Sequence, residues 1–221
     1  MGNEITTINL AGVNCYLVKA DDGYVLIDTG FFFRRGAIDG EIEKAGCKPG
    51  DMKLIIITHG DTDHTGNAVY FRDKHGAKIA MHREESAATE KGSLRFNRKL
   101  NKRSTRIIAR LVFSLPFAGL SKSARFKPDV YVEDGDDFSG YGFKAKALHV
   151  PGHTKGSVAI LTEERDLFCG DLLKSNGKAE KNKLIDDEAE MDESIERLRR
   201  MDIRKVYPGH GRAFTMEELV Q

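Results

Sequence analysis

The stretch from residue 54 to residue 67 constrains the fold more than any other part of the chain. A short apolar run, Leu54–Ile57, is bounded by polar and glycine residues, which predicts a buried strand. Directly after it come four side chains that can bind a metal ion: His59, Asp61, Asp63 and His64. From Ala68 to Gly76 the pattern becomes helical. The cluster is therefore predicted to lie in the turn between a buried strand and a helix, where open α/β sheets place their chemistry.

A bound cation explains this cluster better than an ordinary loop does. Polar residues after a strand often form only a loop, and Asp and Thr are common where helices begin. However, the carboxylates of Asp61 and Asp63 would repel each other, and a cation between them removes that cost. This interpretation requires further ligands elsewhere in the chain.

Further ligand-type residues do occur, each beside glycine or proline after a short apolar or β-like run. The segments are Pro151–His153, Cys169–Asp171 and Pro208–His210. With the first cluster, and in this order, they resemble the pattern of the metallo-β-lactamase-fold superfamily of binuclear metal hydrolases. The resemblance runs from about Cys15 to His210, and four separated motifs in order are far more specific than any one alone.

The resemblance implies a fold and a set of ligands. The expected fold is α/β, a four-layer αββα sandwich of two mixed β-sheets with helices on the outer faces, in a single domain over residues 1–221. Two divalent metal ions are implied. The first would be bound by His59, Asp61 and His153, the second by Asp63, His64 and His210, and Asp171 would bridge the two.

Asp61 stands where the family pattern has its second histidine. Aspartate is a competent but harder ligand than imidazole, and it adds negative charge to the first site. Zinc is the expected metal, although Asp61 favours iron or manganese more than an all-histidine site would. In this respect the chain also resembles the flavodiiron proteins, whose flavodoxin-like half has no counterpart here.

The implied reaction is hydrolysis by a hydroxide that bridges the two metal ions. Asp63 is the predicted catalytic side chain, which would orient the nucleophile and carry its proton. No Gly-x-Ser-x-Gly motif indicates a serine nucleophile. The expected substrate is a small molecule with an ester, thioester, lactone or β-lactam-like amide bond. Three alternatives stay open: a diiron oxidoreductase of the flavodiiron type without its flavin domain, a phosphodiesterase, and a metal-binding module without catalysis.

Residues 91–127 contain eleven Lys or Arg residues and no Asp or Glu. Apolar residues interleave with them, which predicts a basic amphipathic insertion at about 91–128. It could be a solvated face that packs on the domain, a lid that favours an anionic substrate, or a peripheral contact with an anionic membrane. The formal net charge of the whole chain is only +1, so nucleic acid is not an expected partner. The oligomeric state stays open.

The three cysteines, Cys15, Cys47 and Cys169, are far apart in the sequence and form no CxxC motif. This spacing argues against a disulfide framework and fits a reducing compartment. The beginning of the chain shows no signal-peptide pattern, and no apolar run is long enough to span a bilayer. A cytoplasmic location is therefore expected.

A few other polar residues need separate interpretations. Asp28 follows a predicted strand and either hydrogen-bonds a ligand histidine or caps the next turn. The remaining histidines, His75, His82 and His149, are predicted to be structural. Cys169 shares a strand face with Asp171 and is predicted to be a small packed residue rather than a ligand.

Overall fold

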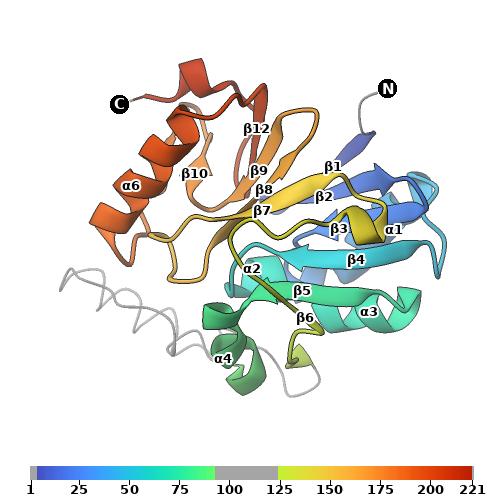
Figure 1. The fold of residues 1–221 in the computed structure, drawn as a ribbon. Coiled ribbons are helices and arrows are strands. Elements are labelled where there is room, and N and C mark those ends of the chain that lie inside the picture. Colours follow the sequence, from blue (N-terminus) through green and yellow to red (C-terminus); the bar gives the residue numbers. More distant parts are fainter. Residues whose placement is uncertain (1–3, 93–123, 221) are drawn as a thin grey trace.

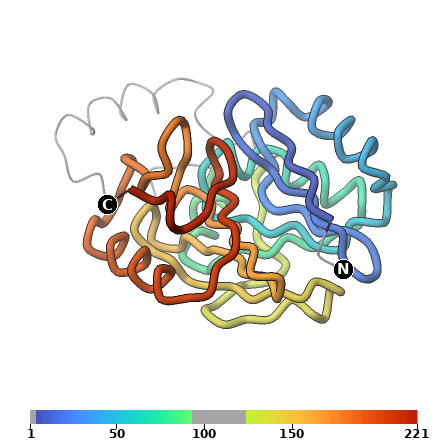
Figure 2. The backbone as a smooth tube through the Cα atoms, turned by 90° about the horizontal axis from the view of Figure 1, so that it is seen from above, coloured from blue at the N-terminus to red at the C-terminus, as the bar shows by residue number. Residues whose placement is uncertain are grey.

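The computed structural model describes residues 4–92 and 124–220. They form a six-stranded sheet, a four-stranded sheet and a small two-stranded sheet, with helices on the outside (Figure 1). Figure 2 shows the N-terminal half, blue to green, beside the C-terminal half, yellow to red. The basic insertion predicted at 91–128 lies mostly outside the described residues. Among the helices that are described, none has both the length and the apolar character needed to cross a bilayer.

The six-stranded sheet has the strand order β1-β2-β3-β4-β5-β6. Its strands are β1 (Ile5–Leu10), β2 (Val13–Ala20), β3 (Gly23–Ile27), β4 (Met52–Ile57), β5 (Lys78–His82) and β6 (Val130–Val132). The first three strands pair antiparallel, and pairing is parallel from β3 to β6. Strands β2 and β3 pair as a hairpin around Asp21–Gly23, a sequence typical of a tight turn.

The four-stranded sheet has the order β12-β9-β8-β7. Its strands are β7 (Ala145–His149), β8 (Val158–Thr162), β9 (Asp166–Gly170) and β12 (Lys205–Pro208). Antiparallel pairing from β7 to β8 to β9, and parallel pairing of β12 with β9, mean that β7, β9 and β12 run in the same direction. Two short strands, β10 (Leu173–Lys174) and β11 (Glu180–Lys181), pair with each other.

The helices lie outside the two large sheets. They are α1 (Arg35–Lys44), α2 (Thr62–Thr65), α3 (Ala68–His75), α4 (Arg83–Lys91) and α6 (Glu188–Arg199), with short 3-10 turns η1 (Phe32–Arg34), η4 (Ser139–Tyr141) and η5 (Met216–Glu218). The predicted end of α3 is confirmed, because Gly76 follows it with φ 67°, a left-handed cap that glycine adopts without strain. Helix α4 was not anticipated from the sequence.

Three apolar cores separate the layers. Leu26 and Ile55 of the first sheet pack with residues of α1 and α3. Their neighbours, Val25 and Ile56, point the other way into the core between the sheets, because side chains alternate along a strand. A third core, which includes Leu198, joins the second sheet to α6. Helix, sheet, sheet and helix therefore stack in that order, and the predicted αββα sandwich is confirmed.

Candidate metal centre

The loops that carry the predicted site follow the carboxyl ends of four strands. Strand β4 leads to residues 59–64, β7 leads to His153, β9 leads directly to Asp171, and β12 leads to His210. The buried apolar strands fix these ends in the two sheets, and the polar side chains come immediately after them. The structure brings all seven predicted side chains together, in three overlapping groups whose potential ligand atoms lie within 4.8 Å of one another.

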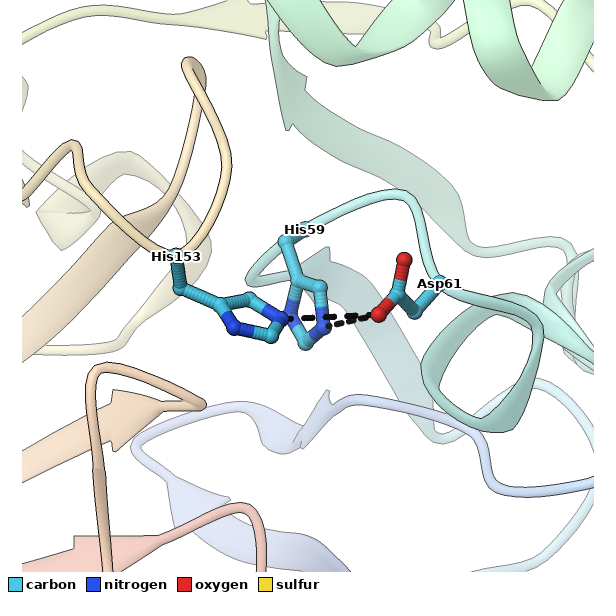
Figure 3. A group of neighbouring side chains, drawn as sticks. All are labelled: His59, Asp61 and His153. Carbon is cyan, nitrogen blue, oxygen red and sulfur yellow. Dashed lines mark ion pairs between the residues drawn. The ribbon is translucent and has the colours of Figure 1, made fainter. Parts of the chain in front are cut away.

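The first group contains His59, Asp61 and His153 (Figure 3). Oδ2 of Asp61 lies 3.6 Å from Nε2 of His59 and 3.4 Å from Nε2 of His153. Asp61 sits at the N-terminal cap of α2, and Figure 3 shows its carboxylate directed toward the two imidazole rings. The carboxylate and the two imidazole nitrogens therefore face a common point.

The second group contains Asp63, His64 and His210. Oδ2 of Asp63 lies 3.7 Å from Nε2 of His64 and 3.5 Å from Nε2 of His210. Asp63 and His64 are neighbours on the single turn of α2, whereas His210 arrives from the loop after β12. Two histidines and one carboxylate thus converge here as they do in the first group.

Asp171 lies between the two groups. Its Oδ1 is 3.4 Å from Nε2 of His64, and its Oδ2 is 3.2 Å from Nε2 of His210 and 3.8 Å from Nε2 of His153. Asn182 donates a hydrogen bond to Oδ2 at 3.1 Å and so helps to hold the carboxylate in place. Asp171 therefore contacts histidines of both groups.

The outer nitrogens of the histidines fix which nitrogen faces the pocket. Nδ1 of His153 lies 2.7 Å from the carbonyl oxygen of Leu184, and Nδ1 of His210 lies 2.8 Å from that of Gly12. A carbonyl oxygen can only accept, so each Nδ1 carries the hydrogen, and in the neutral ring Nε2 presents its lone pair to the centre. Histidine ligands of metal ions are oriented in this way.

Asp28 orients the other two histidines. Its Oδ2 lies 2.8 Å from Nδ1 of His64 and accepts a hydrogen bond from the Thr58 hydroxyl at 2.8 Å. Since that hydroxyl donates to Asp28, its oxygen is left to accept from Nδ1 of His59, 3.0 Å away. The prediction that Asp28 hydrogen-bonds a histidine of the cluster is confirmed, and the connection to His59 through Thr58 was not foreseen.

The carboxylates create a strongly negative field in the pocket. Burial lowers the pKa of His64, but Asp28, Asp63 and Asp171 outweigh it and hold that pKa well above its usual value. Burial likewise opposes the charge on His210, yet hydrogen bonds to Asp171 and Asp63 raise its pKa to about 10. Where no metal ion is bound, the pocket therefore attracts protons.

Several buried polar atoms in the pocket have no hydrogen-bond partner among the described residues. They are Nε2 of His59, Nε2 of His64 and Oδ1 of Asp171. Leaving such groups unsatisfied costs about 1–3 kcal/mol each, and a cation bound by all of them removes this cost. Imidazole nitrogen and carboxylate oxygen are ligands that suit zinc, iron and manganese. The residues present therefore fit divalent metal ions.

The polar residues predicted to be structural lie outside the three groups. Rings of His82 and His149 stack on each other with centroids 4.4 Å apart. Nδ1 of His75 lies 3.1 Å from the carbonyl oxygen of Lys48, at the end of α3. Cys169 is buried in the core between the second sheet and α6, as predicted. The three cysteines are free and buried.

Sequence reasoning missed three residues that support the site: Thr58, Asn182 and Glu85. Thr58 and Asn182 each contact a residue of the pocket directly. Glu85 binds the backbone of two loops that carry predicted ligands. Their partners are distant in the chain or belong to the backbone, and no short motif signals such contacts.

Comparison with known proteins gives a consistent assignment. The family model described as the metallo-β-lactamase superfamily matches residues 8–210. Hydroxyacylglutathione hydrolase GloC of Haemophilus influenzae is 27% identical over 180 residues, which are 80% of this chain and 74% of that protein. Acyl-coenzyme A thioesterase MBLAC2 of Bos taurus is 25% identical over 225 residues, covering 93% of this chain and 75% of that protein.

Solved structures share the fold. The structure of TTHA1623 in a di-iron-bound form superimposes with a TM-score of 0.71 at 25% identity, covering 97% of this chain and 95% of that one. The B3 metallo-β-lactamase BLEG-1 gives a TM-score of 0.74 at 21% identity, with the same coverage of 97% and 95%.

Proposed function

The chain belongs to the metallo-β-lactamase superfamily and is a hydrolase of that fold, and we propose that it hydrolyses a small-molecule thioester with the help of two divalent metal ions. The observation that carries the proposal is the convergence of four Nε2 atoms and three carboxylates at one edge of the two sheets. Divalent cations held there would supply a water nucleophile of lowered pKa and a Lewis acid for the substrate carbonyl.

The ligand groups divide the pocket between two cations. His59, Asp61 and His153 would hold the first, and Asp63, His64 and His210 would hold the second. Asp171 would bridge them, because its two oxygens approach histidines of both groups. With three carboxylates, the pocket can offset three of the four positive charges that two divalent ions bring, and this balance supports binding of both.

Asp63 is the proposed catalytic side chain. Burial would raise the pKa of its carboxyl group, but His64 and His210 more than offset this effect and keep the pKa below its usual value. The carboxylate is therefore ionised at neutral pH and can accept a hydrogen bond from the attacking water. In this way Asp63 would orient the nucleophile toward the substrate carbonyl.

A thioester suits this pocket better than an amide or an alkyl ester does. A thiol has a pKa near 8.5, so a thiolate can leave without a general acid, whereas an amine or alkoxide needs one. All three carboxylates of the pocket would bind the cations, which leaves none of them with a proton to donate to a leaving group.

The names of two relatives support the same substrate class. One is called a hydroxyacylglutathione hydrolase and the other an acyl-coenzyme A thioesterase. Both names describe an acyl group carried by a thiol compound. An acyl thioester of a small anionic thiol is therefore the substrate that we propose.

A panel of substrates tests the proposal. Acyl thioesters of glutathione and coenzyme A are compared with matched oxygen esters, a lactone, a β-lactam and a phosphodiester, each with zinc-loaded, manganese-loaded, iron-loaded and metal-stripped protein. We expect the highest kcat/KM for a thioester, and loss of that activity on stripping. A phosphodiester as the best substrate, or oxygen-dependent chemistry of an iron-loaded protein without thioester hydrolysis, would contradict the proposal.

Zinc remains the expected metal, and Asp61 keeps iron and manganese as alternatives. The carboxylate makes the first site harder than one built from imidazole alone. The relative TTHA1623 is described in a di-iron-bound form. Metal analysis of protein produced without added metal, combined with the panel, distinguishes the three ions.

A further inference from the structure

Glu85 is a completely buried carboxylate that belongs to none of the three ligand groups. It lies in the first turn of α4, next to the strand end that carries His82. Its Oε2 accepts the N–H of Gly60 at 2.7 Å, and its Oε1 accepts the N–H of Gly156 at 2.8 Å. Both of its oxygens are therefore used by the backbone.

The two glycines belong to loops that carry ligands of the first group. Gly60 lies between His59 and Asp61, and Gly156 lies three residues after His153. One loop follows β4 of the first sheet, and the other joins β7 to β8 of the second. A single side chain thus connects the two sheets where the first metal site forms.

The fit between Glu85 and these loops depends on glycine. A Cβ atom at residue 60 would lie 2.8 Å from Oε2 of Glu85, and one at residue 156 would lie 2.8 Å from its Cγ and from its Oε1. Contacts this short would push the carboxylate or the loops apart. The two glycines allow the backbone to approach the carboxylate closely enough for both hydrogen bonds.

Only a carboxylate can satisfy this arrangement. Two N–H donors converge on the two ends of one planar group, so both ends must accept. Glutamine would place its NH₂ group against one of these donors and leave it unsatisfied. The negative charge of Glu85 is stabilised by its place in the first turn of α4. Its neighbour Glu84 adds an ion pair with Lys155, at 2.7 Å, to the same loop.

We propose that Glu85 is a positioning residue, which fixes the spacing of His59 and Asp61 from His153 and so sets the affinity of the first metal site. The inference rests on the proposed metal binding. The second group, on α2 and after β12, has no contact with Glu85 among those described. Loss of Glu85 should therefore weaken one metal site and spare the other.

The variant Glu85→Gln is tested in two backgrounds that isolate the sites. In His210→Ala the first group stays complete and the second loses a ligand, and in His153→Ala the reverse holds. We expect E85Q to weaken zinc binding about 10- to 100-fold in the H210A background, which is typical for loss of a residue that orients a ligand. In the H153A background we expect E85Q to change zinc affinity by no more than about 3-fold, because effects at sites without shared contacts are usually additive. Titration against a chromophoric chelator measures both.

Asp166→Asn provides a matched control. Asp166 is also a buried carboxylate, but it lies at the start of β9, at the opposite end of the strand from Asp171. Its partner is Arg204, which donates to it through a guanidinium nitrogen at 2.7 Å. This variant should lower the free energy of unfolding and leave zinc affinity at both sites unchanged. An equal loss at both sites in E85Q, or no loss at either, would overturn the proposal.

The variant Glu85→Asp distinguishes the effect of side-chain length from the effect of negative charge. Aspartate keeps the charge but is one methylene shorter, so it cannot hold both N–H groups without moving a loop. We expect first-site affinity to fall in E85D as it does in E85Q. Wild-type affinity in E85D would show that charge alone matters and would overturn a positioning role.

Unaltered protein gives an independent test that does not depend on the folding of any variant. Hydrogen exchange at the amides of Gly60 and Gly156 should be slow even after metal is stripped, because Glu85 already holds both N–H groups. Rapid exchange at both would overturn the proposal. The tests of Glu85 itself measure metal binding or hydrogen exchange, so they stay interpretable if thioesters prove to be the wrong substrate.

Discussion

Nδ1 of His64 lies 2.8 Å from Oδ2 of Asp28, and both side chains are almost completely buried. The same carboxylate accepts the backbone N–H and the hydroxyl of Thr58. Asp28 holds this position with φ 58°, a left-handed conformation that is uncommon outside glycine but tolerated by Asp and Asn. Both oxygens of the Asp28 carboxylate thus accept hydrogen bonds. Through these bonds Asp28 orients His64 directly and His59 by way of Thr58.

Asp28→Asn tests this relationship. Asparagine tolerates the same backbone conformation, but its NH₂ group must face one of the three donors. We expect metal affinity and kcat/KM to fall about 10- to 100-fold. Stability should fall by about 1–3 kcal/mol, the usual cost of an unsatisfied buried donor. Asp39→Asn, at a carboxylate that accepts from Tyr70 and Lys74, is the control and should leave metal affinity unchanged.

Removal of one histidine from each group should remove one metal ion. In His153→Ala the first group loses a ligand, and in His210→Ala the second does, so each variant should bind one metal ion per chain. His149→Ala, whose ring stacks on His82 outside the groups, should bind the same number as the wild type. Elemental analysis after dialysis gives the ratio. Retention of two ions by both ligand variants would refute the proposed division of the pocket.

Asp61→His tests the effect of a carboxylate at this position. The change restores an imidazole where the family pattern has its second histidine, and imidazole is the softer ligand. We expect the ratio of zinc affinity to manganese affinity to rise. Competition between the two ions for wild type and variant measures that ratio. An unchanged ratio would show that Asp61 does not influence metal selection.

The pH dependence of stability in metal-stripped protein follows from His210. Its pKa is raised from 6.5 to about 10, because hydrogen bonds to Asp171 and Asp63 outweigh burial. The folded state therefore binds this proton more tightly than the unfolded state, and its contribution is complete below pH 6.5 and is lost as pH rises toward 10. Denaturant unfolding between these pH values should show a larger loss for wild type than for His210→Gln. Equal losses in the two proteins would contradict this account.

The convergence of the seven side chains could be predicted from the sequence, because each of them lies in the segment that follows a strand. A buried strand such as Leu54–Ile57 can be predicted from its run of apolar residues, and polar residues that follow such a run are easily recognised in the sequence. The order of the motifs along the chain resembles the metallo-β-lactamase pattern, and this resemblance implied that His153, Asp171 and His210 lie beside the first cluster, where the structure places them.

The supporting contacts could not be predicted in the same way. Glu85 contacts Gly156, which is 71 residues away, and its partners there and at Gly60 are backbone N–H groups. Helix α4, which carries it, has mostly polar residues and no clear apolar period. The carbonyl oxygens that fix His153 and His210 belong to Leu184 and Gly12, whose side-chain types are irrelevant to the contact.

Asp28 is intermediate between the residues whose contacts could be predicted and those whose contacts could not. Its place after a strand suggested either a contact with a histidine or a capped turn, and the sequence favoured neither. The choice depends on whether α2 lies against the end of β3, which only the folded chain determines. The structure shows that it does, because the N–H and the hydroxyl of Thr29 both bond the carbonyl oxygen of His64 at 2.8 Å.

The most direct measurement of the central claim combines metal content with thioester hydrolysis on the same samples. Protein is purified, stripped with a chelator and reloaded stepwise with zinc, and bound metal and the rate of acyl-thioester hydrolysis are recorded at each step. We predict saturation at two ions per chain and activity that disappears on stripping and returns on loading. Saturation at fewer than two ions, or hydrolysis that continues unchanged in the stripped protein, would contradict the account.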